Sequence, residues 1–188
     1  MLLEVPYNRS NAVAYARQWA LSRNPLFFDF SDQGGNCTNF VSQCILAGCG
    51  IPNETATFGW YYRSEADRAP AWTGVGELFS FLTGVPEFSE ENGGAGPYAL
   101  VATEPAQVAL GDVIQLANRQ GRFYHSLLIS GFTDQDILVC AQSDDALDRP
   151  LSTYNYASLR ILHLLGARLS FPYEERFRLL IEGQSIPL

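Results

Sequence analysis

The chain has 188 residues and a formal net charge of −8, from 20 acidic and 12 basic residues. Such a chain is repelled by nucleic-acid phosphates, and no cluster of lysine and arginine offsets the repulsion, so nucleic-acid binding is not expected. With 47% hydrophobic and 17% charged residues, the composition is that of a globular protein, and we expect one domain over residues 1–188. No apolar run approaches the roughly 20 residues that cross a membrane, so no membrane span is expected.

The chain has few residues with which to build a metal site or a disulfide scaffold. The four cysteines and two histidines are Cys37, Cys44, Cys49, Cys140, His125 and His163. No C-x-x-C spacing occurs, and the aspartates of residues 134–148 match no calcium loop, so we expect no metal and no cofactor. The N-terminus lacks a signal-peptide pattern. As the sequence stands this predicts a cytoplasmic protein, or an extracellular or cell-wall one if a leader has been removed.

The first half of the chain predicts helices and long loops. Residues 8–22 carry apolar side chains at helical spacing and predict an amphipathic helix. A second helix is predicted over residues 37–47, directly after two glycines and an asparagine. The segments that follow are a loop rich in aromatic residues (51–76), a short helix (76–84) and an exposed loop (85–99).

The second half changes to short apolar runs separated by turn residues, a pattern typical of antiparallel strands. The predicted strands are residues 112–118, 125–130, 136–142 and 160–168. Helices followed by a strand meander indicate an α+β fold, with N-terminal helices packed on a C-terminal antiparallel sheet.

Cys37 is the first residue of the second predicted helix. The free N–H groups and the macrodipole of a helix N-terminus lower the pKa of a thiol, and the thiolate is the nucleophilic form of cysteine. Cys44 falls in the apolar stripe of the same helix, Cys49 past its predicted end and Cys140 within a strand, so Cys37 is the candidate nucleophile. By position alone a buried, unreactive cysteine is the more common outcome, so a base has to be found for it.

His125 is the candidate base because it opens a predicted strand and can present its ring at the end of the sheet. His163 lies between two leucines in mid-strand, and we expect a structural role for it. In the hairpin register that pairs Gly131 with Asp136, His125 faces Gln142, whose side-chain carbonyl could orient the ring. A slip of one residue would turn Gln142 to the other face. The candidates for the orienting role would then be Asp144 and Asp145.

Three segments together resemble a known family. These are "CTNFVSQC" at 37–44, "GDV" at 111–113 and "HS" at 125–126. They resemble the putative amidase domain family, which is similar to the papain-like NlpC/P60 and CHAP peptidases and amidases. The resemblance runs from about Tyr7 to about Arg168. It implies a papain-like α+β fold with the helices before the sheet.

The resemblance also implies roles for individual residues. Cys37 would be the nucleophile, His125 the general base and Gln142 the polar residue that orients the base. The oxyanion would be bound by N–H groups at the helix start, with Gln33 or Asn36 as a possible side-chain donor. Two positions depart from the family pattern, which usually has Asp at position 36 and often has His at position 142.

The aromatic loops allow two interpretations that the sequence leaves open. Their side chains could wall a substrate cleft or pack on the core. The aromatic residues concerned are Trp60, Tyr61, Tyr62 and Trp72, of which the two tryptophans are the cleft candidates.

Two functions remain. The first is a cysteine amidase or peptidase acting on a peptide-like or small amide substrate, with bacterial cell-wall peptide suggested by the resemblance. The second is a catalytically weak or inactive module of the same fold that binds cell-wall or peptide ligands. The departures at Asn36 and Gln142 motivate the second.

Overall fold

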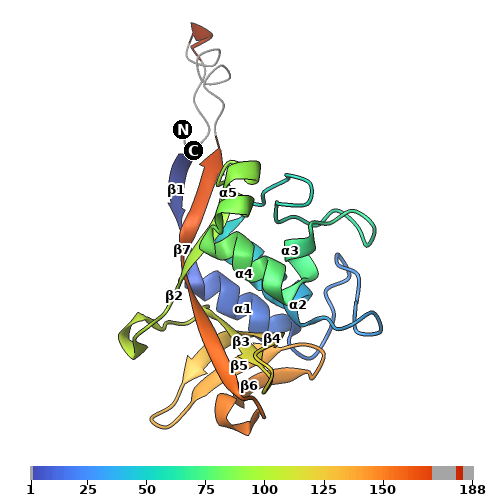
Figure 1. Ribbon diagram of the computed structural model, residues 1–188, viewed down its shortest axis with the longest axis vertical. Helices are drawn as coiled ribbons and strands as arrows, with labels where there is room; N and C mark the ends of the chain where they lie inside the picture. Colours follow the sequence, from blue (N-terminus) through green and yellow to red (C-terminus); the bar gives the residue numbers. More distant parts are fainter. Residues whose placement is uncertain (1, 171–180, 184–188) are drawn as a thin grey trace.

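The computed structural model describes residues 2–170 and 181–183. Helices cover one side of an antiparallel sheet (Figure 1). The elements are, in chain order, β1 (Leu2–Pro6), α1 (Arg9–Trp19), α2 (Cys37–Cys49), α3 (Pro70–Thr73), α4 (Val75–Thr83), α5 (Pro86–Asn92), β2 (Gly96–Val101), the 3₁₀ turn η1 (Pro105–Gln107), β3 (Val113–Ala117), β4 (Phe123–Phe132), β5 (Ile137–Ala141), β6 (Ala146–Pro150), the 3₁₀ turn η2 (Leu151–Thr153) and β7 (Ser158–Ser170).

The seven described strands form one sheet in the order β1-β7-β3-β4-β5-β6, with β2 also paired to β7. Every pairing is antiparallel. β7 is 13 residues long and pairs with β1, β2 and β3, so it spans much of the molecule (Figure 1). The predicted α+β layout and all four predicted strands are therefore confirmed.

Three strands were not predicted from the sequence: β1, β2 and β6. The expectation of an exposed loop over residues 85–99 was wrong, because this segment holds α5 and most of β2. β2 is stabilised by pairing with β7, more than sixty residues away in the chain, and a local pattern carries no sign of such a contact. α2 also continues to Cys49, two residues past its predicted end, before Gly50 closes it with a φ of 66°.

Side chains of the sheet alternate between two apolar layers. On β4, Leu128 packs with α1, α2 and α4, whereas Leu127 and Ile129 face the opposite layer with β6 and η2. This alternation assigns each residue of β4 to one face of the sheet. None of the helices in the described part of the chain is long and apolar enough to cross a lipid bilayer.

A buried carboxylate connects α1 to the start of β3 and to β7. Asp112 is 0% exposed and accepts hydrogen bonds from Arg9 Nη1 at 2.6 Å and from the backbone N–H of Ala109 at 2.8 Å and of Leu164 at 3.1 Å. His163 Nδ1 lies 2.8 Å from its second oxygen. The aspartate of the "GDV" motif thus stabilises the fold, and His163 belongs to the same network.

Candidate active site

The start of α2 carries Cys37 into a pocket. Gly34 and Gly35 turn the chain with φ values of 98° and 115°, which residues with a Cβ rarely adopt. Asn36 follows as the N-cap residue, but its side chain makes no capping bond to the helix. The first-turn N–H groups of α2 are thus not satisfied by that side chain, and they favour negative charge at Cys37.

His125 reaches the same pocket from β4. It is cross-strand partner to Leu116, which places its ring on the face of the sheet opposite the helices. The next residue, Ser126, faces the helices, and its hydroxyl lies 3.0 Å from that of Thr38 in α2. This bond joins the immediate neighbours of Cys37 and His125, and so fixes the start of α2 against β4.

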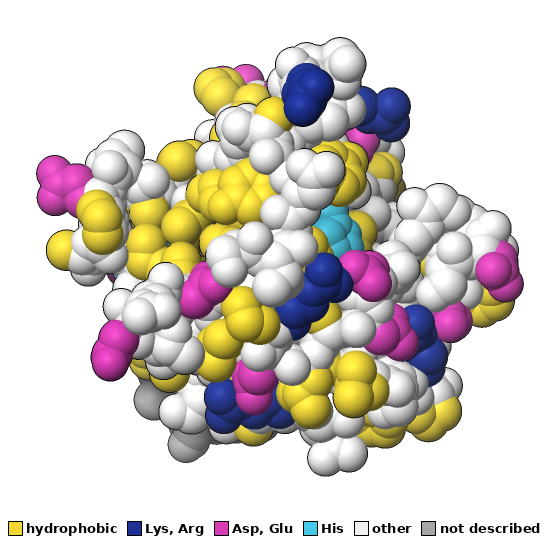
Figure 2. All heavy atoms as spheres, turned by 90° about the horizontal axis from the view of Figure 1, so that it is seen from below, with side chains coloured by type: hydrophobic (Ala, Val, Ile, Leu, Met, Phe, Trp, Pro, Cys, Tyr) yellow, Lys and Arg dark blue, Asp and Glu magenta, His cyan; other side chains and the backbone are white. Residues whose placement is uncertain are grey.

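The pocket has a volume of about 490 Å³ and is open to solvent. Its lining residues are Gly34, Gly35, Cys37, Tyr124, His125, Ser143, Asp144, Arg149, Thr153, Tyr154 and Asn155. In the view from below the orientation of Figure 1, a histidine side chain is visible in a hollow beside basic and acidic side chains (Figure 2). Cys37 and His125 are each 8% exposed, so both side chains are nearly withdrawn from solvent.

The electrostatic surroundings of His125 favour its neutral form. Burial lowers the pKa of His125, an effect opposed by Asp144 and reinforced by Arg149. The ring is therefore neutral at pH 7 and able to accept a proton. Cys37 Sγ has a hydrogen-bonding contact with Thr38 Oγ1 at 3.8 Å, and among the described residues none with the His125 ring.

The other three cysteines are poor nucleophiles. Burial raises the pKa of Cys44 and Cys140, and it raises the pKa of Cys49 to about 11. Cys44 and Cys140 lie in the apolar layer beneath the helices, as expected for core residues. At neutral pH these three thiols remain protonated.

Gln142 does not meet His125. Leu128 pairs with Cys140, so the hairpin register differs by one residue from the one assumed from the sequence, and a bulge follows Ile129. The shift puts Gln142 on the helix side of the sheet, because side chains alternate along a strand. There its Nε2 donates to the carbonyls of Trp19 and Ser22, each at 2.8 Å.

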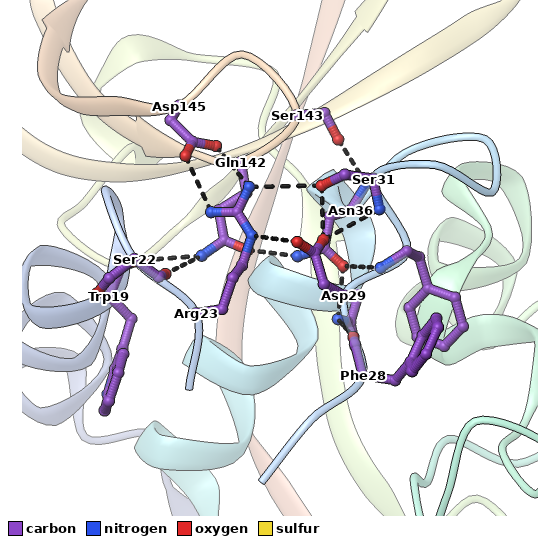
Figure 3. Close-up of polar contacts among 12 residues, drawn as sticks. Trp19, Ser22, Arg23, Phe28, Asp29, Ser31, Asn36, Gln142, Ser143 and Asp145 are labelled. Carbon is purple, nitrogen blue, oxygen red and sulfur yellow. Dashed lines mark hydrogen bonds and ion pairs between the residues drawn. The ribbon is translucent and has the colours of Figure 1, made fainter. Parts of the chain in front are cut away.

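The side-chain oxygen of Gln142 accepts a hydrogen bond from Asn36 Nδ2 (Figure 3). Asn36 is 1% exposed, and its own oxygen accepts from the backbone N–H of Phe30 at 3.0 Å and from Asn39 Nδ2 at 2.8 Å. Its backbone N–H donates to Ser143 Oγ at 2.5 Å. Asn36 and Gln142 therefore contact each other, and the bonds to Gln142, Phe30, Asn39 and Ser143 hold the residue before Cys37 in place.

Asp145 also lies away from His125. Arg23 binds both carboxylate oxygens of Asp145, at 2.9 and 3.0 Å, and reaches Asp29 at 3.1 Å (Figure 3). Ser31 donates to Asp29 from both its backbone N–H and its hydroxyl. This partly exposed network connects the loop before α2 to the loop after β5.

Gln33, Trp60 and Trp72 lie outside the pocket. Gln33 donates to Glu65 at 3.0 Å and so does not point toward Cys37. Both tryptophans are 0% exposed and pack in the core, with ring centroids 4.9 Å apart. Of the two interpretations left open, packing on the core is the one that the structure supports, because aromatic rings bury a large apolar area.

Among the lining residues missed in the sequence are Tyr124, Ser143, Arg149 and Tyr154. Ser143 has a φ of 80°, in the left-handed region, which is uncommon for a residue with a side chain and concentrates at functional sites. Tyr124 precedes His125, and position beside a candidate base is the one signal that could have identified it. Ser143 is brought in by the β5–β6 turn, Arg149 by β6 and Tyr154 by its position directly after η2; neither β6 nor η2 was predicted.

Among residues 2–170 and 181–183, no group of three or more His, Cys, Asp or Glu side chains could hold a metal ion. The pocket itself contains a thiol at a helix start, a neutral imidazole, and an ion pair between Asp144 and Arg149 at 2.6 Å.

The fold and the pocket define an α+β protein in which a helix start and a strand contribute a cysteine and a histidine to one cavity. The chain belongs to the family described as "Putative amidase domain", which matches residues 6–165, and this membership supports a general amidase, and hence hydrolase, function. It is 33% identical over 128 residues to the uncharacterized protein YhbB of Bacillus subtilis (strain 168). That match covers 65% of this chain and 37% of YhbB, so the chain spans well under half of that relative. No solved structure matches the chain.

Proposed function

We propose that this protein is a cysteine-dependent amide hydrolase of the papain-like type, related to the NlpC/P60 and CHAP enzymes, that cleaves a peptide-like substrate. The single observation that carries the proposal is the presence of Cys37 and His125 in the lining of one pocket, with their chain neighbours Thr38 and Ser126 in contact at 3.0 Å. Membership of the amidase family supports the same reaction class.

The proposed reaction has two stages. Neutral His125 takes the proton of Cys37, and the thiolate attacks the carbonyl carbon of the amide. The negative charge on the carbonyl oxygen is stabilised by N–H groups in the first turn of α2. His125 then gives its proton to the leaving amine as the C–N bond breaks, and water hydrolyses the thioester to release a carboxylic acid and restore the thiol.

The surroundings of the pair support positioning rather than direct catalysis by Asn36 and Gln142. Both polar atoms of the Gln142 side chain are used in bonds to Asn36 and to the end of α1, and Asn36 Nδ2 is used in the same contact. Asn36 therefore acts through the backbone of Cys37, whose position it fixes. Because Gln33 is bound to Glu65, backbone N–H groups remain the donors proposed for the oxyanion.

The shape of the surface supports an extended substrate. A second hollow of about 290 Å³ shares Gly34 and Gly35 with the lining of the cysteine pocket. A peptide chain that passes over these two glycines would occupy both hollows, with its scissile amide near Cys37. A Cβ at Gly34 would meet no atom within 4 Å and would stand in the path of such a chain. A bacterial cell-wall peptide is the substrate that we propose to test first.

One observation favours the second candidate, a non-catalytic binding module. Cys37 Sγ has Thr38 Oγ1 as its hydrogen-bonding contact, and the described residues show no bond from Sγ to His125. Catalytic hydrogen bonds are often long without substrate, so the enzyme remains the proposal. The binding module predicts that Cys37→Ala binds cell-wall peptide as the native protein does, and that the native protein hydrolyses nothing.

The test combines labelling with turnover. Limiting iodoacetamide is applied from pH 5 to 9, with the labelled cysteine located by mass spectrometry, and released amine is measured with muropeptides and with neutral peptide amides. If the protein is a cysteine hydrolase, Cys37 is the cysteine labelled fastest below pH 8. Cys37→Ala and His125→Ala then abolish hydrolysis, whereas the control Cys49→Ala retains it. If Cys37 of the native protein reacts no faster than a free thiol below neutral pH, no activated pair of Cys37 and His125 exists.

A further inference from the structure

We infer that Tyr154 orients His125 through one bound water molecule, taking the place of the third residue of the catalytic group. The catalytic consequence rests on the proposed function, but the contact itself does not. Among the described residues, two buried side-chain polar atoms lack a hydrogen-bonding partner: Nε2 of His125 and the hydroxyl oxygen of Tyr154.

The two unpartnered atoms belong to neighbouring rings. The centroids of His125 and Tyr154 are 6.1 Å apart with a tilt of 40°, and both residues line the cysteine pocket. Buried polar atoms in native proteins are almost always paired with protein or with ordered water. Two such atoms on adjacent rings, with no direct bond between them, are what one bridging water would satisfy.

Tyr154 is held firmly enough to act in this way. The guanidinium of Arg149 lies over its ring, 4.1 Å from the centroid. Arg149 is in turn fixed by Asp144 Oδ2, 2.6 Å from Nη1, and by Thr153 Oγ1, 2.8 Å from Nε. The hydroxyl of Tyr154 is therefore placed by a chain of defined contacts.

The face of the sheet explains why Tyr154, and not Gln142, is available. His125 pairs with Leu116 and belongs with it to the layer opposite the helices, and Tyr154 packs on that same layer. Gln142 lies on the helix side with both polar atoms bound. A partner for Nε2 has to come from the layer that contains Tyr154.

The consequence concerns the position of the imidazole proton. A water bound to Tyr154 accepts a hydrogen bond from Nε2–H, so it favours the tautomer protonated at Nε2 and leaves Nδ1 free for the proton of Cys37. The other titratable or charged groups that face the ring are Tyr124, Asp144 and Arg149. Their effect on the ring is on its charge, whereas the bridging water acts on one ring nitrogen.

The experiment is nitrogen-15 NMR of the native protein and of Tyr154→Phe, labelled at histidine. The chain has two histidines, so two rings are observed, and the loss of His125 signals in His125→Ala assigns them. The native ring is expected to carry its proton on Nε2. In Tyr154→Phe the Nδ1–H tautomer becomes substantial, the pKa of His125 falls, and alkylation of Cys37 at pH 7 slows about tenfold. The hydroxyl has no protein partner, so its removal breaks no protein hydrogen bond.

The matched control is Tyr156→Phe, which removes the same atom two residues away and outside the pocket lining. It is expected to leave the His125 tautomer and Cys37 alkylation unchanged. An unchanged tautomer ratio and pKa in Tyr154→Phe, or a native ring protonated at Nδ1, overturns the inference. If Cys37→Ala abolishes hydrolysis while Tyr154→Phe leaves the ring unchanged, the inference fails and the cysteine mechanism stands. If Cys37→Ala hydrolyses normally, the mechanism fails whatever the tautomer.

Discussion

Replacing Gln142 by methionine separates two roles for this residue. Methionine has a similar length and no hydrogen-bonding amide, so Gln142→Met removes three bonds with little change of volume: one from Asn36 Nδ2 and two to the carbonyls of Trp19 and Ser22. If Gln142 holds the loop before Cys37, as its contacts indicate, the protein loses stability. If it orients His125, the imidazole responds instead.

The size of the loss follows from the contacts. A hydrogen bond contributes about 1 kcal/mol net, and a buried donor left without a partner costs about 1–3 kcal/mol. Gln142 and Asn36 are each 1% exposed, so the Asn36 amide cannot recover its bond from bulk water. Apolar burial of the methionine side chain offsets part of this. We expect the free energy of unfolding to fall by about 2–4 kcal/mol.

The assay is urea denaturation followed by tryptophan fluorescence and by circular dichroism, with the histidine NMR spectrum of each variant. The control is Gln135→Met, at an exposed position in the β4–β5 turn, which should change stability by less than about 0.5 kcal/mol. The His125 tautomer should be the same in native protein and Gln142→Met. A loss below about 1 kcal/mol together with a changed tautomer would refute the structural role and favour direct contact with the ring.

Three further predictions address the fold, the base and the nucleophile. Asp112→Ala leaves buried donors without an acceptor, so the free energy of unfolding, measured by urea denaturation, should fall by about 3–5 kcal/mol. The control Asp134→Ala, at an exposed position, should change it little. Equal losses in the two variants would contradict a stabilising role for the Asp112 network. The pKa of His125 is lower in the folded protein than in the unfolded chain, so between that pKa and about 6.5 the unfolded chain binds more protons. The contribution of neutral His125 to the free energy of unfolding is therefore complete above about pH 6.5 and is lost as the pH falls through the folded pKa. An NMR titration midpoint above 6.5 would reverse the sign. In native protein at pH 7, iodoacetamide should label Cys37 before Cys49, because the pKa of Cys49 is raised to about 11. Mass spectrometry gives the order of labelling, and labelling of Cys49 first would show that Cys37 is not activated.

Local pattern was sufficient for the elements with strong periodicity. Residues 8–22 and 37–47 predicted α1 and α2, and residues 112–118 and 125–130 predicted β3 and β4, because apolar spacing records which face of an element is buried. For residues 85–99 the same reasoning predicted an exposed loop, which was wrong. The strand in that segment owes its stability to pairing with β7, and a pairing partner so distant leaves no local sign.

The candidate site divides in the same way. Cys37 at a helix start and His125 near a strand start could be selected from the sequence, since each position has a local chemical meaning. Gln142 could not be placed, because a bulge after Ile129 moves the register by one residue and turns the side chain to the other face. Trp60 and Trp72 could not be placed either, since an aromatic residue in a loop is compatible with both core and surface.

The sequence by itself determined the class of fold, the helix on which the thiol stands and the strand that bears the imidazole, because each depends on short-range periodicity or on a motif. The tertiary structure decided which face each residue of β5 occupies, and it brought Tyr154 and Arg149 beside His125. The first outcome depends on strand register, and the second on the placement of β6 and of the residue after η2 beside β4. Both arise from the packing of the whole chain and not from any one stretch of it.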